Sequence, residues 1–526
     1  MNEISQLINV KFEDKTNYIN TQSNDTICIP FWYPWGPKTL EPFTYTEFLE
    51  TYPPECVTSA ASSEESVPMY LGYAKVLEAF RCGAGSVIAY NVNDEEPKKL
   101  YVSRTWVLGT SPHTDGGDPQ VPGSGQPIDS YILQLKYGGT PYGGILKTQL
   151  SYDVKSDFKY SIKVSFGDTT EIYKGSLTPL VIGGVSYKLC DVINRESTVF
   201  NCIETTVPFG TTTPGFQTPV QLQTLVAAID IASMYYNAYT NVLCDYNVPA
   251  TIYVSPFNGD TNYNDEPSWF YKTILTFCDS LKDRVLLMGY PTSGECKKAS
   301  FETELTKLRG LVTNAYMGAF LCARVKVPVN GVDFETDGTA GWAARISNVA
   351  SSTRINQLPS AFSYGYFPLS LTESSSFGDV LSLHDEGICS IFNSNEGPLI
   401  WGVRSIFNIQ TSYFGQLNIV RVASNIIRNT YPIALQALHT QAAQDPIERA
   451  SYQTRFQQIL DSLVASRCIK SDSSVNLGGE INSDVNTKGG RIFNIVYTVY
   501  FIGVVEKINI TIQATDSSVS ADITTA

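Results

Sequence analysis

The stretch GQLNIVRVASNIIRNTYPIALQALHTQAAQDPIERASYQTRFQQILDSLVASR, residues 415–467, contains two helical patterns joined by a short polar turn. In the first, apolar residues recur three and four positions apart, and Pro432 is expected to kink the helix. The second runs from Pro446 to Arg467, with Asp445 as N-cap and proline at the first helical position. Its apolar face carries Phe456, Ile459, Leu460 and Leu463. We therefore expect a pair of packed helices in this stretch.

A run of β-branched and aromatic residues follows the helical pair. Residues 492–512 read IFNIVYTVYFIGVVEKINITI, and Gly503 is expected to mark a bulge or bend. At the other end of the chain, Ile8, Val10 and Phe12 alternate with polar residues and predict one short strand. Neither end has an obvious partner strand nearby, and exposed strand edges must be covered. Pairing with another chain would cover them, and so would pairing within the same chain.

Short strands and helices alternate in the N-terminal part. Residues 26–33 (TICIPFWY) and 86–92 (SVIAYNV) have strand patterns, and residues 69–81 carry apolar side chains at helical spacing. Thr44 followed by Glu47 predicts a capping box at the start of another short helix. These patterns indicate a small α/β unit.

The pattern changes at about residue 96. Over residues 96–215, turns rich in Gly, Pro and Thr separate short alternating strands, which predicts an inserted β-rich domain. Over residues 216–338, helical patterns such as 268–281 alternate with strand patterns such as 250–254 and 284–289. This alternation predicts a separate α/β domain.

The length and net charge of the chain limit the classes of protein to which it could belong. A chain of 526 residues is more than one hydrophobic core usually serves, so several domains are expected. The net charge of -14 argues against nucleic acid as a main partner, because phosphate neutralisation needs clustered cations. Residues 401–512 nevertheless hold ten Lys and Arg against seven Asp and Glu, which suggests a face that meets an acidic surface. No apolar window is long enough for a membrane span.

Chemical motifs are absent. No phosphate-binding loop, zinc-protease motif, nucleophile elbow or dinucleotide fingerprint occurs. The segments around His113 and around His384 near Cys389 are expected to be a turn and a loop cap. The 11 cysteines form no C-x-x-C pair, and we expect free buried thiols. The absence of these motifs does not exclude an enzyme, because paired carboxylates carry no local signature. We identify no catalytic residue, and we expect no metal site and no cofactor.

Several segments, taken in order, resemble the contractile-tail sheath proteins of bacteriophages and related contractile injection machines. Trp35-Gly36-Pro37 before a short helix, TAGWAAR at 339–345, WGVRS at 401–405 and LNIVRV at 417–422 are similar to the family's motifs. The helix with Phe456 and Leu463 and the final strand run follow in the family's order. The motif residues are Gly36, Pro37, Gly341, Arg345, Trp401, Gly402, Arg404 and Arg421.

The resemblance implies an α+β multidomain protein, with an α/β sheath core built from both chain ends and inserted β-rich and α/β outer domains. The implied division is a strand arm at 1–22, an α/β middle domain at 23–95 with 339–370, a β-rich outer domain at 96–215, an α/β insertion at 216–338, a C-terminal sheath core domain at 371–490 and a strand arm at 491–526.

The resemblance further implies a structural, non-enzymatic subunit of stacked hexameric rings around a tail tube, whose terminal strands join neighbours' sheets. Its implied partners are further copies of itself, the tail tube protein, and the baseplate and tail terminator proteins, in a phage virion tail assembled in the host cytoplasm. Arg449 and Arg455 are candidates to face the tube. The candidates for strand exchange are Ile8, Val10, Phe12, Ile495, Tyr497, Val499, Phe501, Val505, Ile508 and Ile510.

Two alternatives stay open. The Tyr, Trp and Gly content and the β insertion also fit a virion-associated or secreted protein that binds or degrades carbohydrate. A tail-tube or baseplate component is a third possibility, although it should lack the two-helix C-terminal core. For the sheath hypothesis, deleting residues 1–14 or 495–526 is expected to leave a folded subunit that cannot polymerise.

Overall fold

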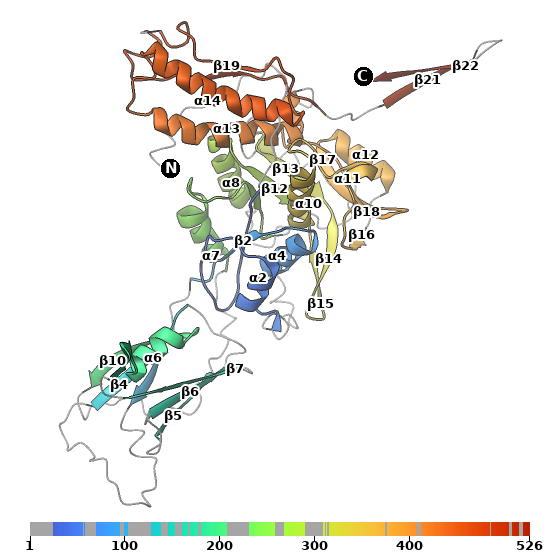
Figure 1. Ribbon diagram of the computed structural model, residues 1–526. Helices are drawn as coiled ribbons and strands as arrows, with labels where there is room; N and C mark the ends of the chain where they lie inside the picture. Colours follow the sequence, from blue (N-terminus) through green and yellow to red (C-terminus); the bar gives the residue numbers. More distant parts are fainter. Residues whose placement is uncertain are drawn as a thin grey trace, which may run out of the picture.

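A seven-stranded sheet forms the centre of the computed structural model (Figure 1). Its strands lie in the order β18-β17-β13-β12-β11-β1-β2, and all are parallel to their neighbours except β18, which runs antiparallel to β17. The structure describes residues 25–55, 57, 70–94, 99–103, 128–137, 146–152, 160–166, 169–176, 180–207, 231–257, 268–289, 309–310, 312, 315–373, 376–407, 412–483, 485–503, 508–514 and 519–525.

Residues from three distant parts of the chain build this sheet. The N-terminal part supplies β1 (Ile27–Phe31) and β2 (Val87–Asn91). The next supplies β11 (Ile252–Val254), β12 (Val285–Gly289) and β13 (Gly318–Cys322). The last supplies β17 (Ile388–Ser394) and β18 (Gly397–Trp401). Strand patterns at 26–33, 86–92, 250–254 and 284–289 are confirmed.

The sheet corrects the predicted separation of residues 216–338. β11 pairs directly with β1, with Ile27 opposite Ile252, so this segment adds strands to the sheet that β1 and β2 begin. Hydrophobic periodicity identifies a strand but does not identify its neighbour, which here lies 225 positions away along the chain. The resulting order, with β1 between β2 and β11, is that of a doubly wound α/β sheet.

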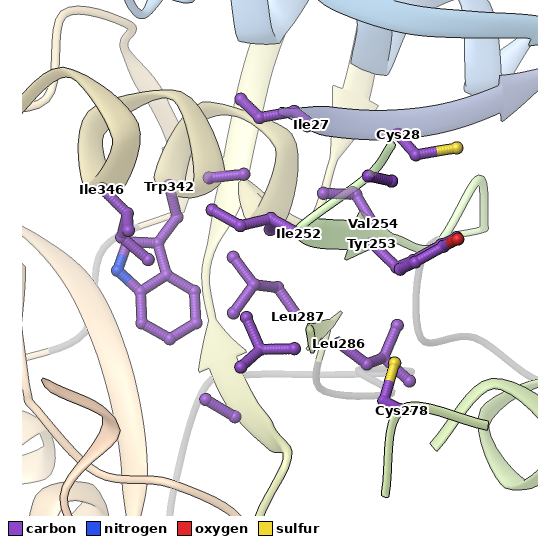
Figure 2. Close-up of a cluster of buried hydrophobic side chains, with 14 of the residues drawn as sticks. Ile27, Cys28, Ile252, Tyr253, Val254, Cys278, Leu286, Leu287, Trp342 and Ile346 are labelled. Atoms are coloured by element: carbon purple, nitrogen blue, oxygen red, sulfur yellow. The ribbon is translucent and has the colours of Figure 1, made fainter. Parts of the chain in front are cut away.

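Helices cover both faces of the sheet, as Figure 2 shows. Trp342 and Ile346 of α10 (Thr339–Ser352) lie against Ile252 and Leu287, while Cys278 of α8 (Ser268–Leu281) lies on the side of neighbouring Leu286. Successive strand residues point to opposite faces, which explains this division. α4 (Leu71–Arg81) packs beside α10. Burial of both faces explains the near-continuous apolar strands.

The predicted capping box is present at α2 (Tyr45–Thr51). The Thr44 amide donates to Glu47 Oε2 at 2.8 Å, and the Glu47 amide donates to Thr44 Oγ1 at 3.4 Å. The Thr44 amide and the Thr44 hydroxyl both donate to the Glu47 carboxylate, and these two bonds lower the pKa of that exposed carboxyl. The helix carries Phe48 and Tyr52 onto the ring of Phe31, with ring centroids 5.5 and 4.8 Å apart.

The described part of residues 96–215 contains two three-stranded sheets, a short two-stranded hairpin and one helix. β3 (Lys99–Ser103), β4 (Ile128–Leu135) and β10 (Phe200–Val207) form one sheet. β5 (Leu146–Tyr152), β6 (Tyr160–Phe166) and β7 (Thr169–Gly175) form the other. Helix α6 (Leu189–Glu196), which the sequence patterns did not predict, packs against β7 and β10. β8 (Val181–Ile182) and β9 (Val185–Ser186) make a hairpin. Figure 1 shows these elements apart from the central sheet.

The remaining elements lie around the central sheet and in the C-terminal part of the chain. They are α7 (Ile231–Ala238), η3 (Tyr239–Leu243), β14 (Arg324–Val329), β15 (Val332–Thr336), α11 (Ala361–Tyr364), β16 (Leu371–Glu373), α12 (Phe377–Asp385), η5 (Tyr413–Gly415), α13 (Leu417–Ala437), α14 (Pro446–Ala465), β19 (Ser474–Asn476), β20 (Val496–Thr498), β21 (Ile508–Ala514) and β22 (Val519–Thr525). Both C-terminal helices begin within two residues of the predicted positions, and Pro432 lies inside α13.

The cysteines in the described part of the chain are free thiols, and all but Cys244 are buried, as predicted. Burial raises the pKa of the Cys468 thiol to about 12, so it stays protonated. Cys389 lies after α12 and donates to the Arg404 carbonyl oxygen, while His384 and Asp385 form the last turn of that helix. Within the described ranges, no group of acidic, histidine and cysteine side chains could hold a metal ion, and no helix is long and apolar enough to cross a membrane.

Candidate assembly surface at the C-terminal end

The helices α13 and α14 pack against each other in the C-terminal part of the chain (Figure 1). Asp445 caps α14, since its Oδ1 accepts from the Ile447 amide at 2.8 Å, and Pro446 occupies the first helical position. Tyr452 donates its hydroxyl to the Gln436 carbonyl oxygen at 2.9 Å, which fastens the start of α14 to the end of α13. Phe456, Leu460 and Leu463 are fully buried. The apolar face predicted from the sequence is therefore confirmed.

A two-stranded sheet, β19 with β20, lies on α14. The Val475 amide of β19 donates to Gln457 Oε1 of α14 at 3.1 Å. Ser474, Val475 and Asn476 pair with Thr498, Tyr497 and Val496 of β20. Within the described residues each of these two strands has a single hydrogen-bonded neighbour strand. The outer edge of β19 is covered by α14, because the Val475 carbonyl oxygen also accepts from Gln453 of that helix. The edge of this sheet that a further strand could join is therefore that of β20.

The structure places Tyr497 and Phe501, both predicted to exchange between subunits, against helices of their own chain. Tyr497 shares a hydrogen bond of 2.8 Å with Thr430 Oγ1, and its ring lies 6.3 Å from the ring of Phe456. Phe501 is 8% exposed and lies 6.3 Å from the ring of Phe414. Ile495 and Val499 also pack on this core. These four side chains thus have intramolecular contacts, and any role in exchange would use the backbone edge of β20.

The last described strands form a hairpin away from the body of the chain. β21 pairs antiparallel with β22, from Ile508 opposite Thr525 to Ala514 opposite Val519. Figure 1 shows this hairpin projecting outward. β21 carries the predicted exchange positions Ile508 and Ile510. β22 was missed, although the alternation in VSADITT after the turn-forming TDSS would have predicted it. The other predicted positions, Ile8, Val10, Phe12 and Val505, lie outside the described residues.

Arg421 on α13 holds the first described residues of the chain. Its guanidinium forms a buried ion pair with Asp25 and donates to the Ile355 carbonyl oxygen at 2.9 Å. Asp25 Oδ1 accepts from Thr251 Oγ1 at 3.1 Å, and its carbonyl oxygen accepts from Ser347 Oγ. Asp25, which lies two residues before β1, is thus fixed to the C-terminal core. Sequence patterns gave no signal for Asp25, because its charge partner lies 396 positions away.

The segment WGVRS connects β18 to η5 and α13. Gly402 has φ +125° and an added Cβ would lie 2.8 Å from the Cys389 Cα, so only glycine fits. Trp401 packs its ring on Phe392, with centroids 6.3 Å apart. Arg404 pairs with Gln416 in an isolated bridge, and Ser405 donates its hydroxyl to the Phe414 carbonyl oxygen. This segment therefore positions the start of α13.

The other motif residues have structural positions. Gly36 has φ +138° beside the Tyr52 ring, and the Tyr52 hydroxyl donates to the Pro37 carbonyl oxygen at 2.6 Å. Gly341 lies in the first turn of α10, where an added Cβ would meet Cys82 Sγ at 2.7 Å. Arg345 follows on the same helix. Gly36 and Pro37 thus contribute to the turn packed on Tyr52, and Gly341 allows the close contact between α10 and Cys82.

The two candidate tube-facing arginines bond within their own domain. Arg449 donates to the Ala443 carbonyl oxygen at 3.1 Å, and Arg455 donates to Gln436 Oε1 at 2.6 Å. The Arg455 guanidinium also lies 5.5 Å from the Tyr452 ring centroid. Both side chains are half-buried, so their charges lie at the margin of the exposed face of α14.

Comparison with solved structures decides the fold. The structure of a sheath tail protein from Listeria innocua superposes with a TM-score of 0.51 at 11% sequence identity, covering 88% of this chain and 91% of that chain. The chain has the fold of a contractile tail sheath protein. A sheath tail protein from Desulfitobacterium hafniense gives a TM-score of 0.48 at 11% identity, covering 89% of this chain and 92% of that chain.

The contracted sheath of an extracellular contractile injection system matches 53% of this chain and 74% of its own, with a TM-score of 0.43 at 13% identity. No protein-family model and no curated protein matches the sequence.

Proposed function

We propose that this chain is a structural, non-enzymatic subunit of a contractile phage tail sheath. In this proposal the subunits polymerise as stacked hexameric rings around the tail tube, and contraction drives the tube through the host envelope. The single observation that carries the proposal is the sheath fold shared over 88% of the chain with the Listeria innocua sheath tail protein. The solved neighbours are sheath and baseplate assemblies, which supports association with further copies and with a baseplate.

Strand exchange between subunits is the proposed means of linking the rings. The β19–β20 sheet has a strand edge at β20 that α14 does not occupy, and the β21–β22 hairpin projects from the body with strands that pair with each other. We assign the acceptor role to the backbone edge of β20, and the donor role to Ile508 and Ile510 with Val505 and the N-terminal Ile8, Val10 and Phe12. Main-chain pairing of this kind survives a change of angle between subunits, so rings can move while staying connected.

The energy of contraction is proposed to come from the lattice. A metastable extended arrangement would relax to one with better-buried contacts, so the subunit itself needs no nucleotide. Within this proposal the chain also contacts the tail tube and terminator proteins, resides in the virion tail and assembles in the host cytoplasm.

The tube-facing role of α14 can be tested by charge reversal. In the variant Arg449→Glu/Arg455→Glu, binding to isolated tail tubes at low salt is expected to weaken at least about tenfold, because two favourable charge contacts become repulsive. Cosedimentation with tubes measures this change. Arg491→Glu is the control, since it alters net charge at an exposed position outside α14. Unchanged binding of the double variant would remove these arginines from the tube interface.

Sedimentation velocity of the full-length chain tests the proposed function. A sheath subunit is expected to form large polymers whose share grows with protein concentration. A single slow boundary of monomer at every salt and protein concentration would contradict the proposal.

A further inference from the structure

A cluster of ionisable side chains is enclosed between α4 and α10. Lys75 of α4 is 0% exposed, and its ammonium lies 2.8 Å from Asp337 Oδ1. The same ammonium donates to the carbonyl oxygens of Ser255 at 3.0 Å and Phe257 at 2.6 Å, which follow β11. It therefore joins three segments that are far apart in the sequence.

Two carboxylates hold the first turn of α10. Asp337 Oδ1 accepts from the Thr339 amide at 3.1 Å and from its hydroxyl at 2.6 Å. Glu78 of α4 accepts through Oε1 from the Gly341 amide at 2.6 Å. The first amides of a helix have no partner within the helix, so these carboxylates satisfy them from two different elements. Glu78 thus connects α4 directly to the start of α10.

The cluster occupies a place where doubly wound sheets commonly hold a ligand, at the carboxyl ends of the strands beside the change in strand order. Ser255 follows β11, and an added Cβ on Gly289, the last residue of β12, would overlap Asp337 Oδ2. The crevice is therefore filled by the chain's own charged groups. Glu78 is 0% exposed and Asp337 is 5% exposed.

The charges in this space do not balance if both carboxyl groups are ionised. One ammonium faces two carboxylates, and the Lys75 charge is already paired with Asp337. The other groups that face the cluster are the Thr336 hydroxyl, Tyr271 of α8 and, beyond Cys82, the guanidinium groups of Arg81 and Arg345. A second buried negative charge is costly in such surroundings.

Burial raises the pKa of the Glu78 carboxyl from its ordinary value near 4.5 to about 7. The negative charge of Asp337 raises the pKa further, while the Thr336 hydroxyl, the Lys75 ammonium and the Gly341 amide oppose the increase. Protonation of Glu78 is compatible with the contacts of this carboxyl group, because its neutral form still accepts the Gly341 hydrogen bond through Oε1.

We propose that Lys75, Asp337 and Glu78 form a proton-linked joint between α4 and α10, in which Glu78 takes up one proton as the chain folds in mildly acidic solution. The proton leaves again when the joint opens. No other reactant is needed, because the solvent supplies the proton and receives it again.

The sign of the pH dependence follows from the two protonation states. Between about pH 4.5 and pH 7 the folded chain holds the proton and the unfolded chain does not, so raising the pH favours unfolding. Over this window Glu78 should raise the unfolding equilibrium constant about tenfold per pH unit. Above about pH 7 both states are ionised, and the contribution becomes constant.

Urea unfolding of the full-length chain and of Glu78→Gln, from pH 5 to pH 8.5, tests the joint. Glutamine keeps an oxygen acceptor for the Gly341 amide but cannot ionise. The ratio of the two unfolding constants should therefore change about tenfold per pH unit below pH 7 and level off above it. Glu396→Gln, at an exposed turn between β17 and β18, should follow the wild type at every pH. Parallel curves for wild type and Glu78→Gln would overturn the proposal.

Infrared spectroscopy of the folded wild-type chain gives a second reading that does not depend on the variant folding. The carbonyl band of a protonated carboxylic acid should be present at pH 6 and should disappear by about pH 8. A spectrum with only carboxylate bands at pH 6 would contradict the proposal, whatever the variant does.

Discussion

Replacing Arg421 with methionine is expected to destabilise the subunit by about 3–5 kcal/mol, because the Asp25 carboxylate is then left buried without its charge partner. Both side chains are nearly inaccessible to water, at 3% and 2% exposed. The substitution also removes the hydrogen bond to the Ile355 carbonyl oxygen. Urea unfolding at neutral pH measures the change in the free energy of unfolding.

The double variant Asp25→Asn/Arg421→Met separates loss of charge from loss of shape. Asparagine removes the buried charge and still offers an oxygen to the Thr251 hydroxyl, which contacts Asp25 Oδ1 in the wild type. We expect the double variant to recover a large part of the loss. Arg354→Met is the control, because that arginine bonds the Arg467 carbonyl oxygen at an exposed position. A loss below about 1 kcal/mol for Arg421→Met would show that the pair contributes like a surface ion pair.

Deleting residues 504–526 is expected to abolish polymerisation while leaving a folded subunit. This deletion removes the β21–β22 hairpin, whose strands pair only with each other among the described strands. It keeps Phe501 in place on Phe414 of η5, and Tyr497 in place on Thr430 of α13. Sedimentation and circular dichroism should report a folded monomer with the unfolding midpoint of the full-length chain.

The longer deletion, residues 495–526, serves as the matched comparison and revises the expectation drawn from sequence. It also removes β20 and the buried Phe501 ring, which should cost several kcal/mol of folding stability, since truncating one buried Phe alone costs about 3–5 kcal/mol. We therefore expect only the shorter deletion, residues 504–526, to give a protein that is fully stable but does not assemble. If the chain without 504–526 still polymerised, the hairpin would not be the exchanged element.

Local patterns predicted the elements with a strong local cause. Asp445 and Pro446 specify the start of α14, and Thr44 with Glu47 specifies the start of α2. In both places a few neighbouring side chains satisfy the first amides of the helix, so the sequence signal and the physical cause coincide.

Long-range pairing could not be predicted in the same way. The join between β1 and β11 and the ion pair between Asp25 and Arg421 each connect residues more than 200 positions apart. Nothing in the periodicity around Asp25 differs from a residue at a turn. The run 492–512 showed a further limit, because its strand pattern is the same whether Tyr497 packs inside its own subunit or pairs with another chain.

Negative-stain electron microscopy of the purified full-length chain tests directly whether the protein is a sheath subunit. A sheath subunit should form long tubes or stacked rings with six-fold end views, and the same preparation without residues 504–526 should show single particles only. Monodisperse single particles of the full-length chain across salt and protein concentration would contradict a sheath subunit.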